Sequence, residues 1–93
     1  MYGGGSGGMG GGSDSGKRIR LRGLPFRATR EDIEKFFVGY DMDPSSITFT
    51  TTPDGRSTGE AFVTFYSSQG RDAAVANLHR QYIGNRFIEL FAT

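Results

Sequence analysis

The sequence predicts an α+β domain, and three observations lead to this class. Segments in which apolar and polar residues alternate occur four times, and segments with helical apolar spacing occur twice. They follow one another in the order β-α-β-β-α-β, which is typical of a ferredoxin-like fold. Right-handed crossovers would then place both helices on one face of a four-stranded antiparallel sheet and leave the other face open.

The first predicted strand and helix come from residues near the start of the domain. Residues 18–22 alternate, with Ile19 and Leu21 on one face, and predict a strand. Thr29 followed three residues later by Asp32 resembles a capping box, which favours a helix start. The apolar residues that follow share one helical face: Ile33, Phe36, Phe37 and Tyr40.

A strand pair is predicted next. Residues 46–51 and residues 60–66 both alternate, so each predicts a strand. The Pro-Asp-Gly sequence at 53–55 lies between them, and it favours a tight turn because Pro presets φ and Gly accepts a positive φ. Three side chains of the second strand in this pair are expected to face the core: Ala61, Val63 and Phe65.

The domain should end with a helix and a strand. Ser67 or Ser68 can cap a second helix that runs to about His79. Residues 87–91 alternate and predict the last strand, with Ile88 and Leu90 facing inward. The domain is therefore predicted over residues 17–93.

A glycine-rich stretch precedes the predicted domain. The first sixteen residues contain nine glycines and no branched aliphatic side chain. Such a stretch has no apolar surface to offset the entropy of ordering it. Residues 1–16 are therefore predicted to be a flexible leader or linker, whether natural, part of a longer low-complexity region, or an artificial addition.

Composition excludes several function classes. The chain has no cysteine, which excludes disulfides, thiol nucleophiles and cysteine–zinc sites. The only histidine, His79, has no evident partner acid, so the sequence suggests no catalytic triad and no metal site. We therefore expect no enzyme activity, no metal and no cofactor. No apolar run reaches membrane-spanning length, so we expect a soluble chain without a membrane partner.

Two of the predicted strands have the spacing and apolar skeleton of an RNA recognition motif, in which sheet aromatics stack on splayed bases. Arg20, however, stands where the first-strand ring is expected, and Glu60 replaces one of two rings on the third strand, leaving Phe62. We expect Arg20 to lie between Glu60 and Glu89 in a charge ladder. Since the two carboxylates repel phosphates, the sheet face is poorly suited to RNA.

Binding is expected at the rim of the sheet instead. Residues 22–26 lead from the first strand to the first helix, residues 84–87 lead into the last strand, and both loops should lie at adjacent corners. Two arginines and two rings would then form one cluster: Arg22, Phe26, Arg86 and Phe87. Rings stack on unpaired bases, and guanidinium groups fork onto the O6 and N7 atoms of guanine. Further cations expected to contact RNA are Arg20, Arg27 and Arg56.

At these residues the chain resembles a known family. The runs Arg-Gly-Leu-Pro-Phe, Gly-Glu-Ala-Phe-Val and Asn-Arg-Phe-Ile-Glu-Leu-Phe are similar to the quasi-RNA-recognition motifs of heterogeneous nuclear ribonucleoproteins F and H. The resemblance covers residues 17–93. It maps the arginine before Gly-Leu-Pro onto Arg22, the aromatic after Pro onto Phe26, and an Arg-aromatic pair onto Arg86 and Phe87.

The resemblance also implies a function. Single-stranded guanine runs would be bound through loops rather than the sheet, in pre-mRNA processing and splicing. It implies a monomeric module of a larger multi-domain protein, with protein partners in ribonucleoprotein complexes. The expected location is nuclear, with shuttling to the cytoplasm left open.

An alternative is a variant of the fold that captures a peptide. Such variants resemble this chain in having an Arg and a Phe before the last strand and acids on the first helix. Their usual spacing leaves one residue between the Arg and the Phe, whereas Arg86 and Phe87 are adjacent. Structural roles also stay open at this point: Phe26 could staple its loop to the helix, and Phe87 could fold under the sheet edge.

Overall fold

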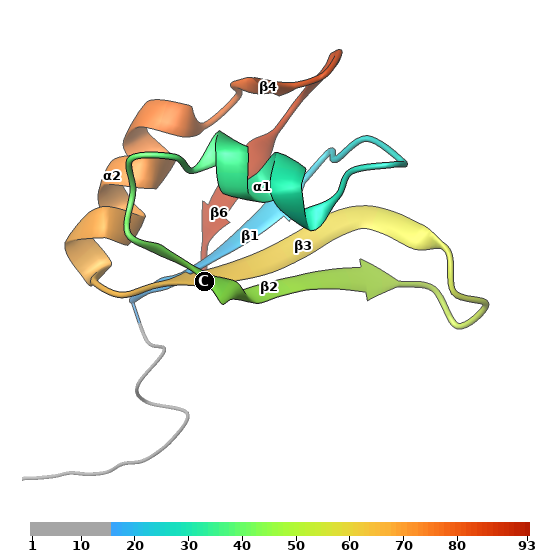
Figure 1. Ribbon diagram of the computed structural model, residues 1–93, viewed down its shortest axis with the longest axis horizontal. Coiled ribbons are helices and arrows are strands. Elements are labelled where there is room, and N and C mark those ends of the chain that lie inside the picture. The colour runs from blue at the N-terminus through green and yellow to red at the C-terminus, as the bar shows by residue number, and fades with distance from the viewer. Residues whose placement is uncertain (1–15) are drawn as a thin grey trace, which may run out of the picture.

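The structure is a computed structural model that describes residues 16–93. Its main sheet has the strand order β2-β3-β1-β6, with antiparallel neighbours throughout. Both helices lie over the same face of this sheet (Figure 1). In chain order the elements are β1 (Arg18–Arg22), α1 (Arg30–Phe36), β2 (Met42–Thr51), β3 (Ser57–Phe65), α2 (Ser68–Leu78), β4 (Tyr82–Ile83), β5 (Arg86–Phe87) and β6 (Glu89–Ala92). The predicted α+β architecture is confirmed, while the predicted leader lies outside the described residues except for Gly16.

The helix starts follow from the capping residues. The Thr29 hydroxyl accepts a hydrogen bond from the Asp32 N–H (3.2 Å), and the Asp32 carboxylate accepts one from the Thr29 N–H (2.9 Å). The Ser67 hydroxyl accepts from the Gly70 N–H at 3.0 Å, which makes Ser67 the cap of α2. Helix α1 ends at Phe36, so the predicted apolar stripe continues beyond the helix.

Strand β2 begins earlier than predicted, at Met42. Its pairing with β3 shifts register between Asp43 and Thr48, and this irregular stretch accommodates Pro44 on an edge strand. The Ser46 hydroxyl accepts from the Thr64 N–H at 2.7 Å and so replaces a missing ladder bond. Alternation alone did not reveal this stretch because a bulge breaks the period of two.

The predicted last strand is divided into two parts. Arg86–Phe87 pairs with Tyr82–Ile83 in a separate hairpin, and Glu89–Ala92 pairs with β1 in the main sheet. The turn contains Gly84 at φ +62°, a conformation that glycine adopts without strain. The hairpin holds Phe87 outside the main sheet.

The free edge of β6 is covered by the residues that directly follow α2. The Leu90 N–H donates to Nδ1 of His79 at 2.9 Å, and the Arg80 N–H donates to the Ile88 carbonyl at 2.7 Å. These bonds satisfy backbone groups that an edge strand would otherwise expose.

The core lies between the helices and the sheet. It contains the predicted inward residues of β1, β3 and β6, and the Phe37 and Phe65 rings meet edge to face at 5.3 Å. The fully buried side chains of largest volume are Phe37, Phe65, Ile19, Leu21, Ile33, Ile88 and Val63. Neither described helix has the length and apolar content that crossing a bilayer requires.

Candidate nucleic-acid interface

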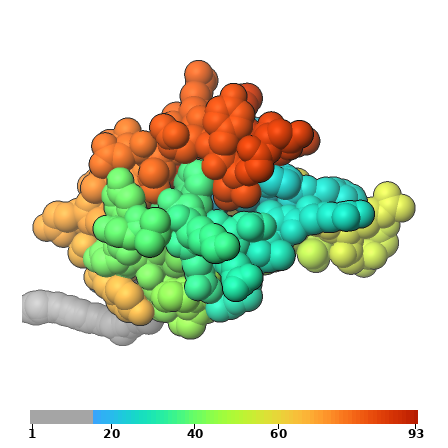
Figure 2. All heavy atoms as spheres, turned by 45° about the horizontal axis from the view of Figure 1, so that its top comes forward, coloured from blue at the N-terminus to red at the C-terminus, as the bar shows by residue number. Residues whose placement is uncertain are grey.

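An open hollow of about 570 Å³ lies where β1 and β3 meet the C-terminal hairpin. In space-filling view the C-terminal segment lies against the loop that follows β1 (Figure 2). The polar, charged and aromatic side chains in its lining are Arg22, Thr58, Glu60, Asn85, Arg86, Phe87 and Glu89. This volume suits a group the size of a nucleobase with part of its backbone.

Two glycines allow the three chain segments around the hollow to approach closely. Gly23 has φ +93°, and a Cβ atom there would lie 2.9 Å from the Phe87 carbonyl oxygen. The N–H groups of Gly23 and Leu24 both donate to the Gly59 carbonyl at 3.0 Å. Gly59 itself has φ +81°. The loop after β1, the start of β3 and β5 are thus held close to one another by backbone contacts.

Three of the four predicted rim residues come together in this hollow, namely Arg22, Arg86 and Phe87. Phe87 is 50 % exposed, so it does not fold under the sheet edge. Its ring meets the Tyr82 ring edge to face at 6.4 Å across the hairpin, which supports it from behind. Phe26 is 77 % exposed on the neighbouring loop and does not line the hollow.

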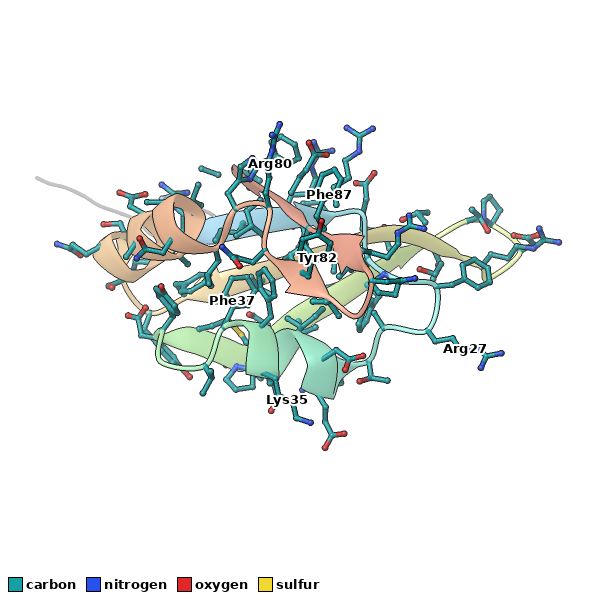
Figure 3. The ribbon with its side chains drawn as sticks, turned by 90° about the horizontal axis from the view of Figure 1, so that it is seen from above. Arg27, Lys35, Phe37, Arg80, Tyr82 and Phe87 are labelled. Atoms are coloured by element: carbon teal, nitrogen blue, oxygen red, sulfur yellow. The ribbon has the colours of Figure 1, made fainter. Side chains whose placement is uncertain are left out.

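The additional cations lie apart from the hollow. Arg27 projects away from Phe87 (Figure 3). Arg56 belongs to the turn between β2 and β3, where its Nε lies 3.3 Å from an Asp54 carboxylate oxygen. Arg20 is on the open sheet face. The predicted set of RNA-contacting residues is therefore spread over the rim, a distant turn and the sheet.

The register of the strands corrects the expected charge ladder. Arg22, and not Arg20, stands opposite Glu60 on one side and Glu89 on the other. The prediction that both acids flank Arg20 is therefore wrong in its register, although the Arg20 guanidinium still reaches the diagonal Glu60 carboxylate at 3.5 Å. Sliding a strand by two residues keeps every side chain on its face, so alternation cannot distinguish these registers.

The aromatic rings of the sheet face are covered by arginines. The Arg18 guanidinium carbon lies 4.4 Å from the Phe62 ring centroid, within cation–π range. The Arg20 guanidinium lies 4.9 Å from the centroid of Phe91 and reaches Glu60 at 3.5 Å. Both rings that could receive a base are thus already stacked on a side chain, a role that the sequence did not reveal for Arg18.

A smaller hollow of about 230 Å³ lies between α1 and the hairpin. Its lining residues are Asp32, Lys35, Phe36, Tyr82 and Ile83. The main hollow, by contrast, has no residue of α1 in its lining. Asp32 of α1 thus lies beside Tyr82–Ile83, the hairpin strand that pairs with Arg86–Phe87, but neither Arg86 nor Phe87 lines this smaller hollow.

Comparison with known families matches residues 19–93 to the RRM domain. The chain belongs to the RNA recognition motif family. Over 73 residues this RRM domain is 47 % identical to heterogeneous nuclear ribonucleoprotein F of Mus musculus and to heterogeneous nuclear ribonucleoprotein H of Homo sapiens. These matches cover 78 % of the chain but only 17 % and 16 % of the two relatives, so the chain spans about a sixth of their length.

Solved structures support the same assignment. The RRM domain superposes on the Glorund qRRM2 domain with a TM-score of 0.77 and 42 % identity, covering 83 % of this chain and 88 % of that one. It superposes on G-rich RNA sequence binding factor 1 from Homo sapiens with a TM-score of 0.77 and 30 % identity, covering 83 % and 79 %. The predicted resemblance to the quasi-RNA-recognition motifs of the F and H proteins is confirmed.

Membership of the family also answers the question of catalysis. RRM domains are nucleic-acid-binding modules whose ordinary platform is the open sheet face. The prediction that the chain is not an enzyme is confirmed by this membership. The domain differs from the ordinary module in having arginines over its sheet aromatics.

Proposed function

We propose that this domain binds single-stranded, guanine-rich RNA at the hollow rather than across its sheet. The observation that carries the proposal is the convergence of Arg22, Arg86 and Phe87 in an open depression of about 570 Å³. The rings of Phe62 and Phe91 support the same proposal, because each already lies against an arginine side chain that a base would have to displace. The name of the structural relative G-rich RNA sequence binding factor 1 supports guanine as the base.

The chemistry of the hollow suits an unstacked purine. Phe87 presents half of its surface to solvent, and stacking on such a ring contributes about 1–3 kcal/mol per base. Arg22 and Arg86 supply planar guanidinium forks that match the O6 and N7 acceptors of guanine. Phe26 lies outside the hollow, exposed on the loop that follows β1, where its ring would stack on a neighbouring base.

The wider role is inferred from the relatives. Their names place them among heterogeneous nuclear ribonucleoproteins, which supports a nuclear role in pre-mRNA processing and splicing. Residues 17–93 would act as one module of a larger protein that has partners in ribonucleoprotein complexes. A single small module binds weakly, so linked copies would supply avidity through a raised effective concentration.

The proposal is tested by an NMR titration with a guanine-run RNA, using uridine-run and cytidine-run RNAs as controls. We expect the largest amide shifts in residues 22–27 and 84–88, with smaller shifts at Phe62 and Phe91 on the open sheet face. Strongest shifts centred on Phe62 and Phe91 would contradict loop binding. Equal responses to all three RNAs would contradict guanine preference, and no response to any would favour peptide capture.

A further inference from the structure

The side chains that line the hollow carry both positive and negative charges, which suits a nucleobase better than a phosphate group. Its lining holds two arginines, Arg22 and Arg86, and two glutamates, Glu60 and Glu89, so the formal charges cancel. A site built to hold phosphates would be cationic throughout. A lining that mixes donors and acceptors instead suits an uncharged ring with both kinds of group on its edges.

Guanine is such a ring. Its O6 and N7 atoms accept hydrogen bonds, while its N1–H and N2 amino group donate. An ionised carboxylate has only acceptors, and its two oxygens can receive two parallel N–H donors. Adenine would place its N1 acceptor against the same carboxylate, so the two purines would be told apart.

The two glutamates differ in their availability. Glu60 has an oxygen 3.5 Å from the Arg20 guanidinium, so it already has a cationic neighbour. The carboxylate of Glu89 makes no ion pair or hydrogen bond with another side chain in residues 16–93. Glu89 is the first residue of β6, where it stands opposite Arg22, and it follows Phe87 by two residues in the chain.

We propose that Glu89 is a specificity-determining residue whose carboxylate receives the N1–H and N2 amino groups of a guanine stacked on Phe87. Arg22 or Arg86 then contacts O6 or N7 on the adjoining Hoogsteen edge of the base. The inference rests on the proposed function, and it adds a residue that selects guanine over adenine. It also gives the acid a purpose on a surface where a negative charge otherwise disfavours RNA.

The test compares the full chain with its Glu89→Gln variant by calorimetric titration. The probes are a guanine-run RNA and copies in which inosine, which lacks the N2 amino group, replaces one guanine at a time. For the parent chain, inosine at the recognised position should weaken binding about tenfold, because one of the two hydrogen bonds to the carboxylate is lost while the N1–H bond remains. Glu89→Gln should bind the guanine RNA about tenfold more weakly and lose most of its sensitivity to inosine there.

A purely electrostatic role for Glu89 would change the RNA affinity of the Glu89→Gln variant in the opposite direction. If Glu89 acted only as a negative charge, Glu89→Gln would bind RNA more tightly because phosphate repulsion is relieved, and that result would overturn the inference. Glu34→Gln, which removes the same charge from the exposed side of α1, serves as the matched control and should not alter the inosine response. If the parent binds guanine RNA and Glu89→Gln leaves the inosine effect intact, the inference fails while the proposed function stands. If the parent shows no guanine preference, both fail.

Discussion

At the scale of single residues, the hollow depends on two side chains that meet in it and on one glycine that lets their segments approach. Arg22 and Phe87 meet there although 64 residues that build the rest of the fold separate them in the chain. Gly23 makes the meeting possible, because any larger residue would press on the Phe87 carbonyl. Function and packing are therefore coupled in adjacent residues, 22 and 23.

Removing a side chain that grips the base should weaken binding without unfolding the domain. Arg22→Ala and Phe87→Ala should each weaken binding of guanine-run RNA by about 1–3 kcal/mol, the range of a bidentate or stacking contact. Both side chains are exposed, so the free energy of unfolding should change little. Fluorescence anisotropy and urea denaturation check the two quantities, and unchanged affinity in both variants would refute the proposed cluster.

Gly23→Ala should destabilise the fold through two effects. A left-handed backbone conformation disfavours alanine by about 1–2 kcal/mol, and the new Cβ atom would also lie 2.9 Å from the Phe87 carbonyl oxygen. Gly55→Ala is the matched control, because Gly55 has φ +87° with nothing within 4 Å. In urea denaturation Gly23→Ala should lower the free energy of unfolding more than Gly55→Ala does. Equal decreases would show that the close approach to Phe87 does not contribute to the destabilisation.

At the scale of elements, the arginines of β1 decide how the sheet face behaves. Arg18 covers Phe62 on β3, and Arg20 covers Phe91 on β6. Strand β1 therefore covers an aromatic ring on each of its two neighbouring strands. An uncovered Phe62 and Phe91 would resemble the stacking platform of the ordinary RRM. Strand β1 thus contributes Arg22 to the hollow and also blocks the open sheet face as a competing RNA-binding surface.

Uncovering those rings should therefore create a second binding surface. In an NMR titration with uridine-run RNA, the Arg18→Ser, Arg20→Ser double variant should show new amide shifts in β3 and β6, because base stacking on rings tolerates any base. Each single variant provides a control, since Arg18→Ser uncovers Phe62 alone and Arg20→Ser uncovers Phe91 alone. A double variant that behaves like the parent would show that the arginines do not close the face.

The Asp43 carboxylate in the irregular start of β2 should stabilise the folded domain at neutral pH, and this stabilisation should disappear in acid. Hydrogen bonds from the Ser45 hydroxyl (2.7 Å) and the Ser45 N–H (3.0 Å) lower the pKa of Asp43 below its usual value. A lowered pKa in the folded state stabilises the fold above the unfolded pKa of 3.8, and this contribution is lost as pH falls through the folded value. The difference in unfolding free energy between the parent and Asp43→Asn should shrink below about pH 4. A difference that persists at lower pH would contradict this assignment.

At the scale of the whole molecule, weak overall charge limits how RNA can be held. The formal net charge of the chain is +1, and the charges that line the hollow cancel. Affinity should then come from base contacts rather than from released counterions. This separates the domain from proteins that hold duplexes through many phosphates.

The salt dependence of binding measures this balance. With about three phosphate contacts on single-stranded RNA, the slope of log affinity against log salt should be about −2. Titrations at several salt concentrations check the value. A slope several times steeper would assign binding to the basic residues spread along residues 17–30 instead of the hollow.

The sequence by itself determined the fold class, the element order and most of the core. Periods of two and 3.6 place side chains on faces, and the caps Thr29 and Ser67 mark helix starts through bonds to residues three positions away. The same local patterns identified Arg22, Arg86 and Phe87 as candidates from their two short motifs. Each of these inferences depends on interactions within a few residues along the chain.

Only the tertiary structure decided which side chains meet. Strand register made Glu60 and Glu89 the neighbours of Arg22, and the hairpin placed Phe87 beside Gly23 while leaving Phe26 outside the hollow. Register and hairpin docking depend on contacts between segments distant in sequence, and a shift of two residues leaves the apolar pattern unchanged. The local pattern therefore sets the face that a side chain occupies, and packing between distant segments sets its partner.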